Sequence, residues 1–316
     1  MILEQRAQRS GKLLSFLRRE LGLSTTMVNR LKQRDAMFVN GRPVHTDHPV
    51  AAGDRISVCI EEPEPEYPAE EGPLSILYED EAVLALDKPA GLMMHPSRSR
   101  NTGTLANRVA WYYRETGQLC AFHPVSRLDR DTFGVVLLAK NGHTHARLCA
   151  AHQAGELEKV YLAAVWGTPP EEAGTIDRPI ARLDSRGLLR GVRADGQRAV
   201  TDYRVLRRGE KGALVELHPR TGRTHQLRVH MADLGCPILG DPQYGSAASQ
   251  AWSLAHGLAV QQLCAVSLTF PHPLRAERVR IESRQGVLLP ETDEIWAASI
   301  LNGRLNFEKL PFSTNG

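Results

Sequence analysis

The 316-residue sequence lacks the features that mark several large classes of protein. Its five cysteines are scattered and include no CxxC pair, which argues against a disulfide framework and against a zinc ribbon. No apolar stretch approaches the roughly 20 residues of a membrane-spanning helix, and charges interrupt the first 21 residues, unlike a secretory signal. Neither a GxGxxG loop nor a P-loop is present. These absences predict a cytoplasmic protein that uses no nucleotide cofactor and no metal ion.

Charge is distributed unevenly along the chain. Residues 1–60 carry ten Lys and Arg against five Asp and Glu, whereas residues 61–73 carry six Glu and no basic residue, and the whole chain has a net charge of +3. This balance predicts a small basic module that binds a polyanion, followed by a mobile, acidic, Pro-rich tether. A solvated basic face without a ligand would give the same balance, so charge alone leaves both interpretations open.

The basic module shows short periodic segments. Leucines at helical spacing predict a first helix that stops at Gly22, and these are Leu13, Leu14, Leu17 and Leu21. Thr25 or Thr26 is expected to cap a second helix over residues 27–35, with Met27 and Leu31 facing inward. Asn40-Gly41 predicts a β-hairpin, and residues 53–60 predict a further strand.

Two helices followed by a hairpin resemble the S-four-like RNA-binding domain. The resemblance lies in LGLSTTMVNRLKQRDAMFVNGRPV (residues 21–44) and AAGDRISV (residues 51–58), and the chain departs from the pattern at residues 11–13, where Gly-Lys-Leu replaces the common Arg-Leu-Asp. It implies that basic side chains of this module contact structured RNA, namely Arg18, Arg19, Arg30, Lys32, Arg34 and Arg42.

Beyond residue 73 the sequence alternates short apolar runs with three helical segments, at residues 104–113, 143–154 and 225–234. The alternation is too irregular for a doubly wound fold. It predicts the α+β class, with a mostly antiparallel mixed sheet flanked by helices. The expected domains are a module at 1–60, a linker at 61–73, a catalytic domain at 74–285 and an extension at 286–316.

The densest polar cluster lies in residues 123–140, where Arg127, Asp129, Arg130 and Asp131 directly precede a buried strand. Opposite charge lowers the pKa of a carboxyl group, which suits a nucleophile or a general base. The same cluster in isolation is more often a structural network of ion pairs.

A second cluster lies in residues 217–235, where a helix is expected to bury Leu227, Met231 and Leu234. Arg228 is one position from that buried seam, so it can reach a partly buried carboxylate and hold it through a bidentate pair. A solvated arginine near the helix start is the simpler alternative.

A third segment, LEKVYLAAVWG, places Lys159 and Tyr161 on one face of a strand. A tyrosine at this place can stack on a nucleic-acid base, although strands are rich in tyrosine for packing reasons alone.

Taken in order, these segments resemble the RluA-type pseudouridine synthase family. The matching motifs are DKPAGLMMHPS (87–97), SRLDRDTFG (126–134), KVY (159–161), RTGRTHQLRVHMADLGCPILGD (220–241) and HGLAVQQLCAVSLTFPHP (256–273). The resemblance implies that uridines in structured RNA, ribosomal or transfer, are isomerised without a cofactor by a monomeric enzyme.

By position in these motifs, the resemblance makes Asp129 the nucleophile, Arg228 its ion-pair partner, Tyr161 the base-stacking residue and Arg127 the residue that fills the space left by the flipped nucleotide. It also implies RNA contacts for Arg130, Arg223 and His225. The chain departs from the family pattern at Ser126, where His is common, and at Phe133, where Ser is common.

Three alternatives remain at this stage. A glycosidase would use Asp129 and Asp131 together, but residues two apart on an extended chain point to opposite faces. A metal hydrolase would draw its ligands from one helix, as His143, His145, Cys149 and His152. A non-catalytic RNA-binding protein would need only the basic module.

Overall fold

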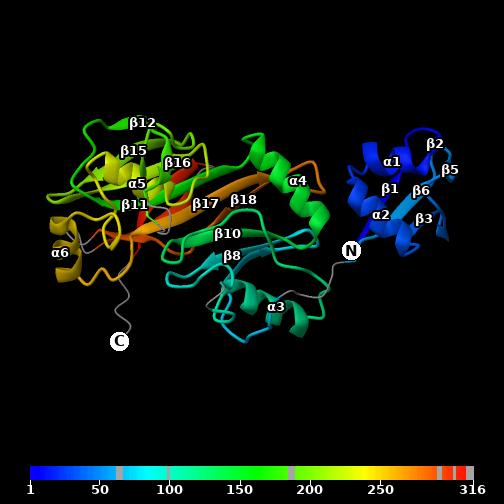
Figure 1. Ribbon diagram of the computed structural model, residues 1–316, viewed down its shortest axis with the longest axis horizontal. Coiled ribbons are helices and arrows are strands. Elements are labelled where there is room, and N and C mark those ends of the chain that lie inside the picture. The colour runs from blue at the N-terminus through cyan, green and yellow to red at the C-terminus, as the bar shows by residue number, and fades with distance from the viewer. Residues whose placement is uncertain (62–66, 98–99, 184–188, 290–293, 302–303, 311–316) are drawn as a thin grey trace.

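The chain forms two units with separate hydrophobic cores. The computed structural model describes residues 1–61, 67–97, 100–183, 189–289, 294–301 and 304–310, and it describes side chains as far as residue 288. One core contains only residues 7–60, whereas the remaining cores draw on residues 82–287. Figure 1 shows the smaller, N-terminal unit at one end of the molecule.

The N-terminal unit contains two helices and a four-stranded sheet. The helices are α1 (Leu13–Arg19) and α2 (Thr25–Gln33). The strands, in spatial order, are β1 (Ile2–Arg6), β6 (Arg55–Cys59), β3 (Met37–Val39) and β4 (Arg42–Pro43). A two-stranded pair adds β2 (Gly11–Lys12) and β5 (Pro49–Val50). Asn40 and Gly41 have positive φ values of 50° and 79°, so the predicted hairpin between β3 and β4 is confirmed.

Two details of this unit correct the sequence-based expectation. The cap of α2 is Ser24 rather than Thr25 or Thr26, because Ser24 is extended and its hydroxyl accepts the N–H of Met27 at 3.1 Å. The first residues, where no strand was expected, form β1. Pairing with β6 along Ile2–Arg6 decides the structure of this segment.

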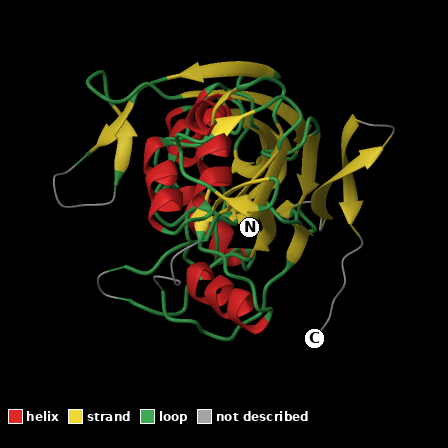
Figure 2. Cartoon of the chain, turned by 90° about the vertical axis from the view of Figure 1, so that its right-hand side faces the viewer, coloured by secondary structure: helices red, strands yellow, loops and turns green. Residues whose placement is uncertain are grey.

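The larger unit is built on a ten-stranded sheet (Figures 1 and 2). Its main path runs β12 (Ala173–Asp177), β15 (Val200–Arg208), β16 (Gly212–Pro219), β11 (Glu158–Trp166), β17 (Leu263–Pro271), β10 (Phe133–Ala139), β8 (Val83–Lys88) and β7 (Ile76–Glu79). Off this path, β18 (Arg278–Glu282) pairs with β17, and β9 (His123–Pro124) pairs with β10. The β10–β17 pair is parallel and the other described pairs of this sheet are antiparallel, so the predicted fold class is confirmed.

The three predicted helices of this unit are present with small shifts of their ends. They are α3 (Leu105–Glu115), α4 (Gly142–Gln153) and α5 (Gln226–Asp233). A fourth helix, α6 (Ala247–Ala255), was not expected from the sequence. No helix of the described residues is both long and apolar enough to span a bilayer.

Short sheets and turns complete the described chain. They comprise the pair β13 (Ile180–Arg182) and β14 (Arg190–Val192) and the sheet β19 (Val287–Leu289), β20 (Glu294–Leu301) and β21 (Arg304–Leu310). Residues 290–293, 302–303 and 311–316 of the expected C-terminal extension lie outside the described residues.

The expected tether is partly bound to the larger unit. Asn107 of α3 donates to the carbonyl of Pro68 at 2.8 Å and accepts the N–H of Glu70 on its own carbonyl at 3.1 Å, and Arg108 donates to Pro73 at 3.2 Å. Part of the expected tether, within residues 68–73, therefore contacts α3. Residues 62–66 of the tether lie outside the described residues.

One glycine determines how the first polar cluster meets the centre of the sheet. Gly134 has φ +104°, and a Cβ atom there would lie 2.3 Å from the carbonyl oxygen of Ala265 in β17. Only glycine allows this approach of the two backbones. As a result β10 starts against β17, and the loop that carries Asp129 ends at the centre of the sheet.

Candidate active site

The predicted catalytic residues meet in one cavity of about 330 Å³. Its walls come from the loop before β10, from the start of β11 and from the turn and helix of residues 219–228. Asp129, Tyr161 and Arg228 all line it, together with Arg127, Arg223 and His225. The volume lies within the range of small-molecule pockets.

Asp129 and Arg228 form an ion pair, as expected. The Nη1 group of Arg228 donates to Oδ2 of Asp129 at 3.2 Å, across 99 positions of sequence. The side chain of Arg228 is 7% exposed and that of Asp129 is 23% exposed. The carboxylate therefore faces the cavity while its partner lies behind it.

The bidentate pair of Arg228 is with a different carboxylate, which corrects the expected geometry. Its Nε and Nη2 groups donate to Oδ2 and Oδ1 of Asp241 at 2.7 and 2.8 Å, and Asp241 has no exposed side-chain surface. The bonds to Asp241 and then Asp129 outweigh the effect of burial and raise the pKa of Arg228. Because two of the three guanidinium nitrogens bond Asp241, only Nη1 bonds the predicted nucleophile.

Asp241 was not singled out by the sequence, although it ends the motif that contains Arg228. Its Oδ1 also accepts the backbone N–H groups of Gln243 and Tyr244 at 2.9 and 3.1 Å. An acidic residue after the apolar run CPILG was the available signal, since a buried carboxylate needs a charged or hydrogen-bonding partner. Its partner could not be read from the sequence.

The ring of Tyr244 packs against the guanidinium of Arg228. The guanidinium carbon of Arg228 lies 4.8 Å from the centroid of the Tyr244 ring, a cation–π contact. The hydroxyl of Tyr244 is 2.8 Å from Nδ1 of His225, whose Nε2 is 3.8 Å from Oδ2 of Asp129. His225 has φ +57°, an uncommon conformation for a residue with a side chain, and precedes α5.

Tyr161 faces the same cavity from β11, where the pairing with β17 shifts register between Val160 and Tyr161. Burial and the charge of Asp129 both raise the pKa of its phenol. The phenol is therefore neutral at physiological pH, and the ring offers its face and an O–H group rather than a negative charge.

Lys88 holds the loop that carries Asp129 through the carbonyl of Arg130. Its side chain is fully buried, and its ammonium donates to the carbonyls of Pro89, Leu92 and Arg130 at 3.0, 2.8 and 2.8 Å. Burial lowers the pKa of Lys88 to about 8, against the opposing charges of Asp131 and Asp129. A lysine inside an apolar strand was the sequence signal for this role.

The two aspartates of the first cluster have different partners. Asp131 is bound by its neighbour Arg130, through Nε at 3.0 Å and Nη2 at 2.9 Å, whereas Asp129 is bound by Arg228. Asp129 lines the cavity and Asp131 does not. This separation gives no support to joint action of the two carboxylates on one glycosidic bond.

The residues expected to contact RNA lie mostly on exposed surface. Arg127 and Arg223 are exposed on the rim of the cavity, and Arg130 is exposed but paired with Asp131. In the N-terminal unit Arg34 pairs with Glu61 at 2.7 Å, and Arg18 donates to Thr25. All six basic residues predicted there are exposed, namely Arg18, Arg19, Arg30, Lys32, Arg34 and Arg42.

The helical histidines do not form the alternative metal site. Burial lowers the pKa of His143 to about 4, His145 contacts Cys149 at 3.4 Å, and His152 contacts Lys159 at 2.7 Å. No group of three or more His, Cys, Asp or Glu side chains able to hold a metal ion occurs in the part of the chain that the structure describes.

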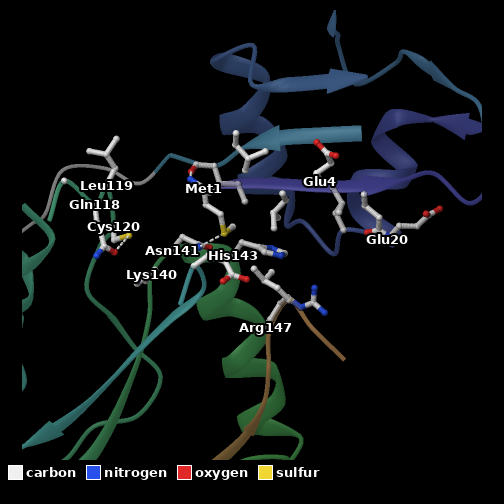
Figure 3. A pocket seen from close by; sticks show the side chains of 18 residues that line it. Met1, Glu4, Glu20, Gln118, Leu119, Cys120, Lys140, Asn141, His143 and Arg147 are labelled. Carbon is white, nitrogen blue, oxygen red and sulfur yellow. Dashed lines mark hydrogen bonds between the residues drawn. The ribbon is translucent and has the colours of Figure 1, made fainter. Parts of the chain in front are cut away.

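A wider hollow of about 670 Å³ lies between the two units (Figure 3). There the amide of Asn141 donates to the sulfur of Met1 at 3.2 Å, and Glu4, His143 and Arg147 also line the hollow. It contains none of the residues expected to be catalytic, so the smaller cavity is the candidate active site.

Comparisons with known proteins agree with this geometry. A family model described as RNA pseudouridylate synthase matches residues 82–233. The uncharacterized RNA pseudouridine synthase YhcT of Bacillus subtilis is 36% identical over 278 residues, which are 86% of this chain and 88% of that protein. Ribosomal large subunit pseudouridine synthase D of Pseudomonas aeruginosa is 38% identical over 250 residues, 76% of each chain.

Solved structures share the fold of the larger unit. Human RNA pseudouridylate synthase domain containing 4 matches with a TM-score of 0.53 and 28% identity, over 66% of this chain and 87% of that one. Human RNA pseudouridylate synthase domain containing 1 matches with a TM-score of 0.55 and 24% identity, over 70% and 92% of the chains, which shows the fold. The chain therefore belongs to the RNA pseudouridine synthase family of isomerases, in the RluA-type group that its motifs resemble.

Proposed function

We propose that this enzyme converts specific uridines of structured RNA to pseudouridine, with Asp129 as the nucleophile. One observation carries the proposal: the carboxylate of Asp129 faces a cavity of about 330 Å³ while Arg228 holds it from behind at 3.2 Å. The bond from Arg228 holds the carboxylate in one orientation toward the cavity, as a nucleophile requires. All the proposed site residues come from one chain, so a monomer suffices.

The reaction breaks the bond between uracil N1 and C1′ of the ribose, turns the ring and joins C5 to C1′. The proton on C5 is lost and N1 gains one, so the composition of the nucleotide does not change. Asp129 attacks either the ribose or the ring and is released in the second half of the reaction. No oxidant, reductant or added group is consumed.

The target base must leave its stack before Asp129 can reach it. We assign the stacking surface to Tyr161, because its neutral ring shares the cavity with Asp129. We propose that Arg127, an exposed residue on the rim, fills the space that the flipped base leaves. Arg130, Arg223 and His225 would contact the RNA around them.

For the N-terminal unit we propose an S-four-like RNA-binding domain at residues 1–60, joined by a linker at 61–73 to a catalytic domain at 74–285 and an extension at 286–316. Its helix pair, its hairpin and its exposed basic residues support this role. The name of the Pseudomonas relative favours large-subunit ribosomal RNA as the target, with transfer RNA as the second candidate.

The test compares Asp129→Asn with Asp131→Asn on RNA from cells that lack the gene. Asparagine keeps the shape of Asp129 but is not an anionic nucleophile, so we expect no pseudouridine and nearly unchanged RNA affinity. Asp131→Asn should retain measurable turnover, because Asp131 bonds Arg130 outside the cavity.

Mapping of pseudouridine in total RNA with and without the gene would identify the substrate. Substantial turnover by Asp129→Asn would refute the assignment. Loss of turnover in Asp131→Asn alone would assign the nucleophile to Asp131 instead. Binding of RNA without any product by the wild-type protein would favour the non-catalytic alternative.

A further inference from the structure

Besides Arg127, Arg223 and Arg228, the cavity contains a lysine for which neither the ion pair of Asp129 nor base stacking accounts. Lys159 is the second residue of β11, two positions before Tyr161, and both side chains line the cavity. Alternate residues of a strand share a face and lie about 6.6 Å apart. Lys159 and Tyr161 are therefore placed to contact the same nucleotide or adjacent nucleotides.

Lys159 is partly buried and has no carboxylate partner in the described chain. Its ammonium donates to Nε2 of His152 at 2.7 Å, and the neighbouring Glu158 instead pairs with Arg278 at 2.9 Å. A lysine has no acceptor, so His152 is the acceptor and is neutral in this pair. Two N–H groups of the ammonium remain for a ligand.

The charged surroundings of Lys159 differ from those of Arg228. Burial lowers the pKa of Lys159 to about 8, with no opposing contribution from Asp129, whereas Asp129 does oppose the shift of Lys88. A shielded ammonium without a counter-ion is costly, and an anionic ligand would remove that cost.

We propose that Lys159, oriented by His152, forms a subsite for a phosphodiester group of the RNA next to the flipped uridine. The inference rests on the proposed function, since RNA supplies the anion. Lys159 would help to hold the backbone while Tyr161 contacts the base. His152 is a positioning residue that acts through Lys159.

The experiment uses the full-length enzyme and an unmodified large-subunit ribosomal RNA transcribed in vitro. Lys159→Met keeps the length of the side chain and removes its charge, Lys159→Arg restores the charge, and Lys211→Met is the control on an exposed turn outside the cavity. Affinity is measured against salt concentration, and pseudouridine formation is measured in single turnover.

In Lys159→Met we expect affinity to fall about tenfold, as for the loss of a charged hydrogen bond worth about 1.4 kcal/mol. The slope of log affinity against log salt should become shallower by about 0.7, the contribution of one contact to a single-stranded phosphate. The single-turnover rate at saturating RNA should change less than about twofold. Lys159→Arg should recover the slope and Lys211→Met should not alter it.

A purely structural role of Lys159 would lower the thermal midpoint of unfolding in Lys159→Met. We expect the midpoint to equal that of the wild type, or to rise because a shielded charge without a carboxylate partner is removed. The inference is overturned if affinity and salt slope are unchanged, or if the saturated rate falls while both stay constant, which would place Lys159 in the chemistry. Failure of the proposed function is separate, since it would appear as no pseudouridine made by the wild-type enzyme in any cellular RNA.

Discussion

The guanidinium of Arg228 bonds two carboxylates, and the two interactions differ in geometry and burial. The fork toward Asp241 is bidentate and fully buried, whereas one Nη1 group reaches Asp129 at the edge of the cavity. The fork fixes the plane of the guanidinium, and that plane directs Nη1 at Asp129. Asp241 is thus a positioning residue for Arg228.

We expect Arg228→Lys to lower the single-turnover rate about a hundredfold or more, because an ammonium cannot form the fork and also reach Asp129 in the same direction. Asp241→Asn should lower the single-turnover rate less than Arg228→Lys does. It should cost about 3 kcal/mol of unfolding free energy, because it removes one partner of a buried charged pair. Rapid-quench kinetics and urea unfolding measure the two effects.

Near-normal turnover in Arg228→Lys would show that charge alone is needed. An unchanged stability in Asp241→Asn would show that the fork contributes little to the fold. Asp131→Asn is the matched control for both measurements, since its carboxylate is bound by the exposed Arg130.

At the scale of elements, the junction of β10 with β17 positions the loop that carries Asp129. The strands pair in parallel at Phe133 and Gly134, and the polar cluster ends one residue earlier, at Thr132. Gln261, just before β17, donates to the hydroxyl of Thr132 and links the two elements. A shift of this junction would move Asp129 relative to Arg228.

Gly134→Ala is expected to destabilise the enzyme by about 3 kcal/mol or more, because its Cβ would meet the carbonyl of Ala265 and its φ of +104° is unfavourable for alanine. The control is Gly257→Ala, where φ is +70° and no atom lies within 4 Å of the added Cβ. It should cost about 1 kcal/mol, from the backbone conformation alone. Equal losses in urea unfolding would show that the close approach at Gly134 is not needed.

At the scale of the whole molecule, the separate core of residues 1–60 suggests that the two units have different functions, RNA binding and catalysis. This unit carries exposed basic residues, whereas the proposed catalytic residues belong to the larger unit. The larger unit alone should therefore retain the chemistry and lose part of the affinity.

We expect deletion of residues 1–60 to weaken RNA binding and to flatten its dependence on salt, because fewer phosphate contacts release fewer counter-ions. The single-turnover rate at saturating RNA should fall much less than the affinity. The full-length variant Arg30→Glu with Lys32→Glu should reproduce the loss of affinity without removing the fold of the unit. An unchanged salt slope in both proteins would contradict this role.

The sequence alone determined the local features of this protein. Asn40-Gly41 specifies its hairpin through backbone preferences of adjacent residues, and the apolar periodicities of α3, α4 and α5 specify helices. The motifs around Asp129, Tyr161 and Arg228 identified the family for the same reason, since each motif is contiguous. The resemblance that these motifs carry implied that the three residues share a site.

Only the tertiary structure decided how the charges are paired. Three features depend on contacts that folding brings about. They are the pairing of Arg228 with Asp241, the burial of Lys88, and the pairing of Lys159 with His152 rather than with a carboxylate of the described residues. The strand β1 is also decided in this way, because its partner β6 lies about fifty residues away. Local preference acts over a few residues, whereas desolvation and ion pairing depend on all the neighbours that folding brings together.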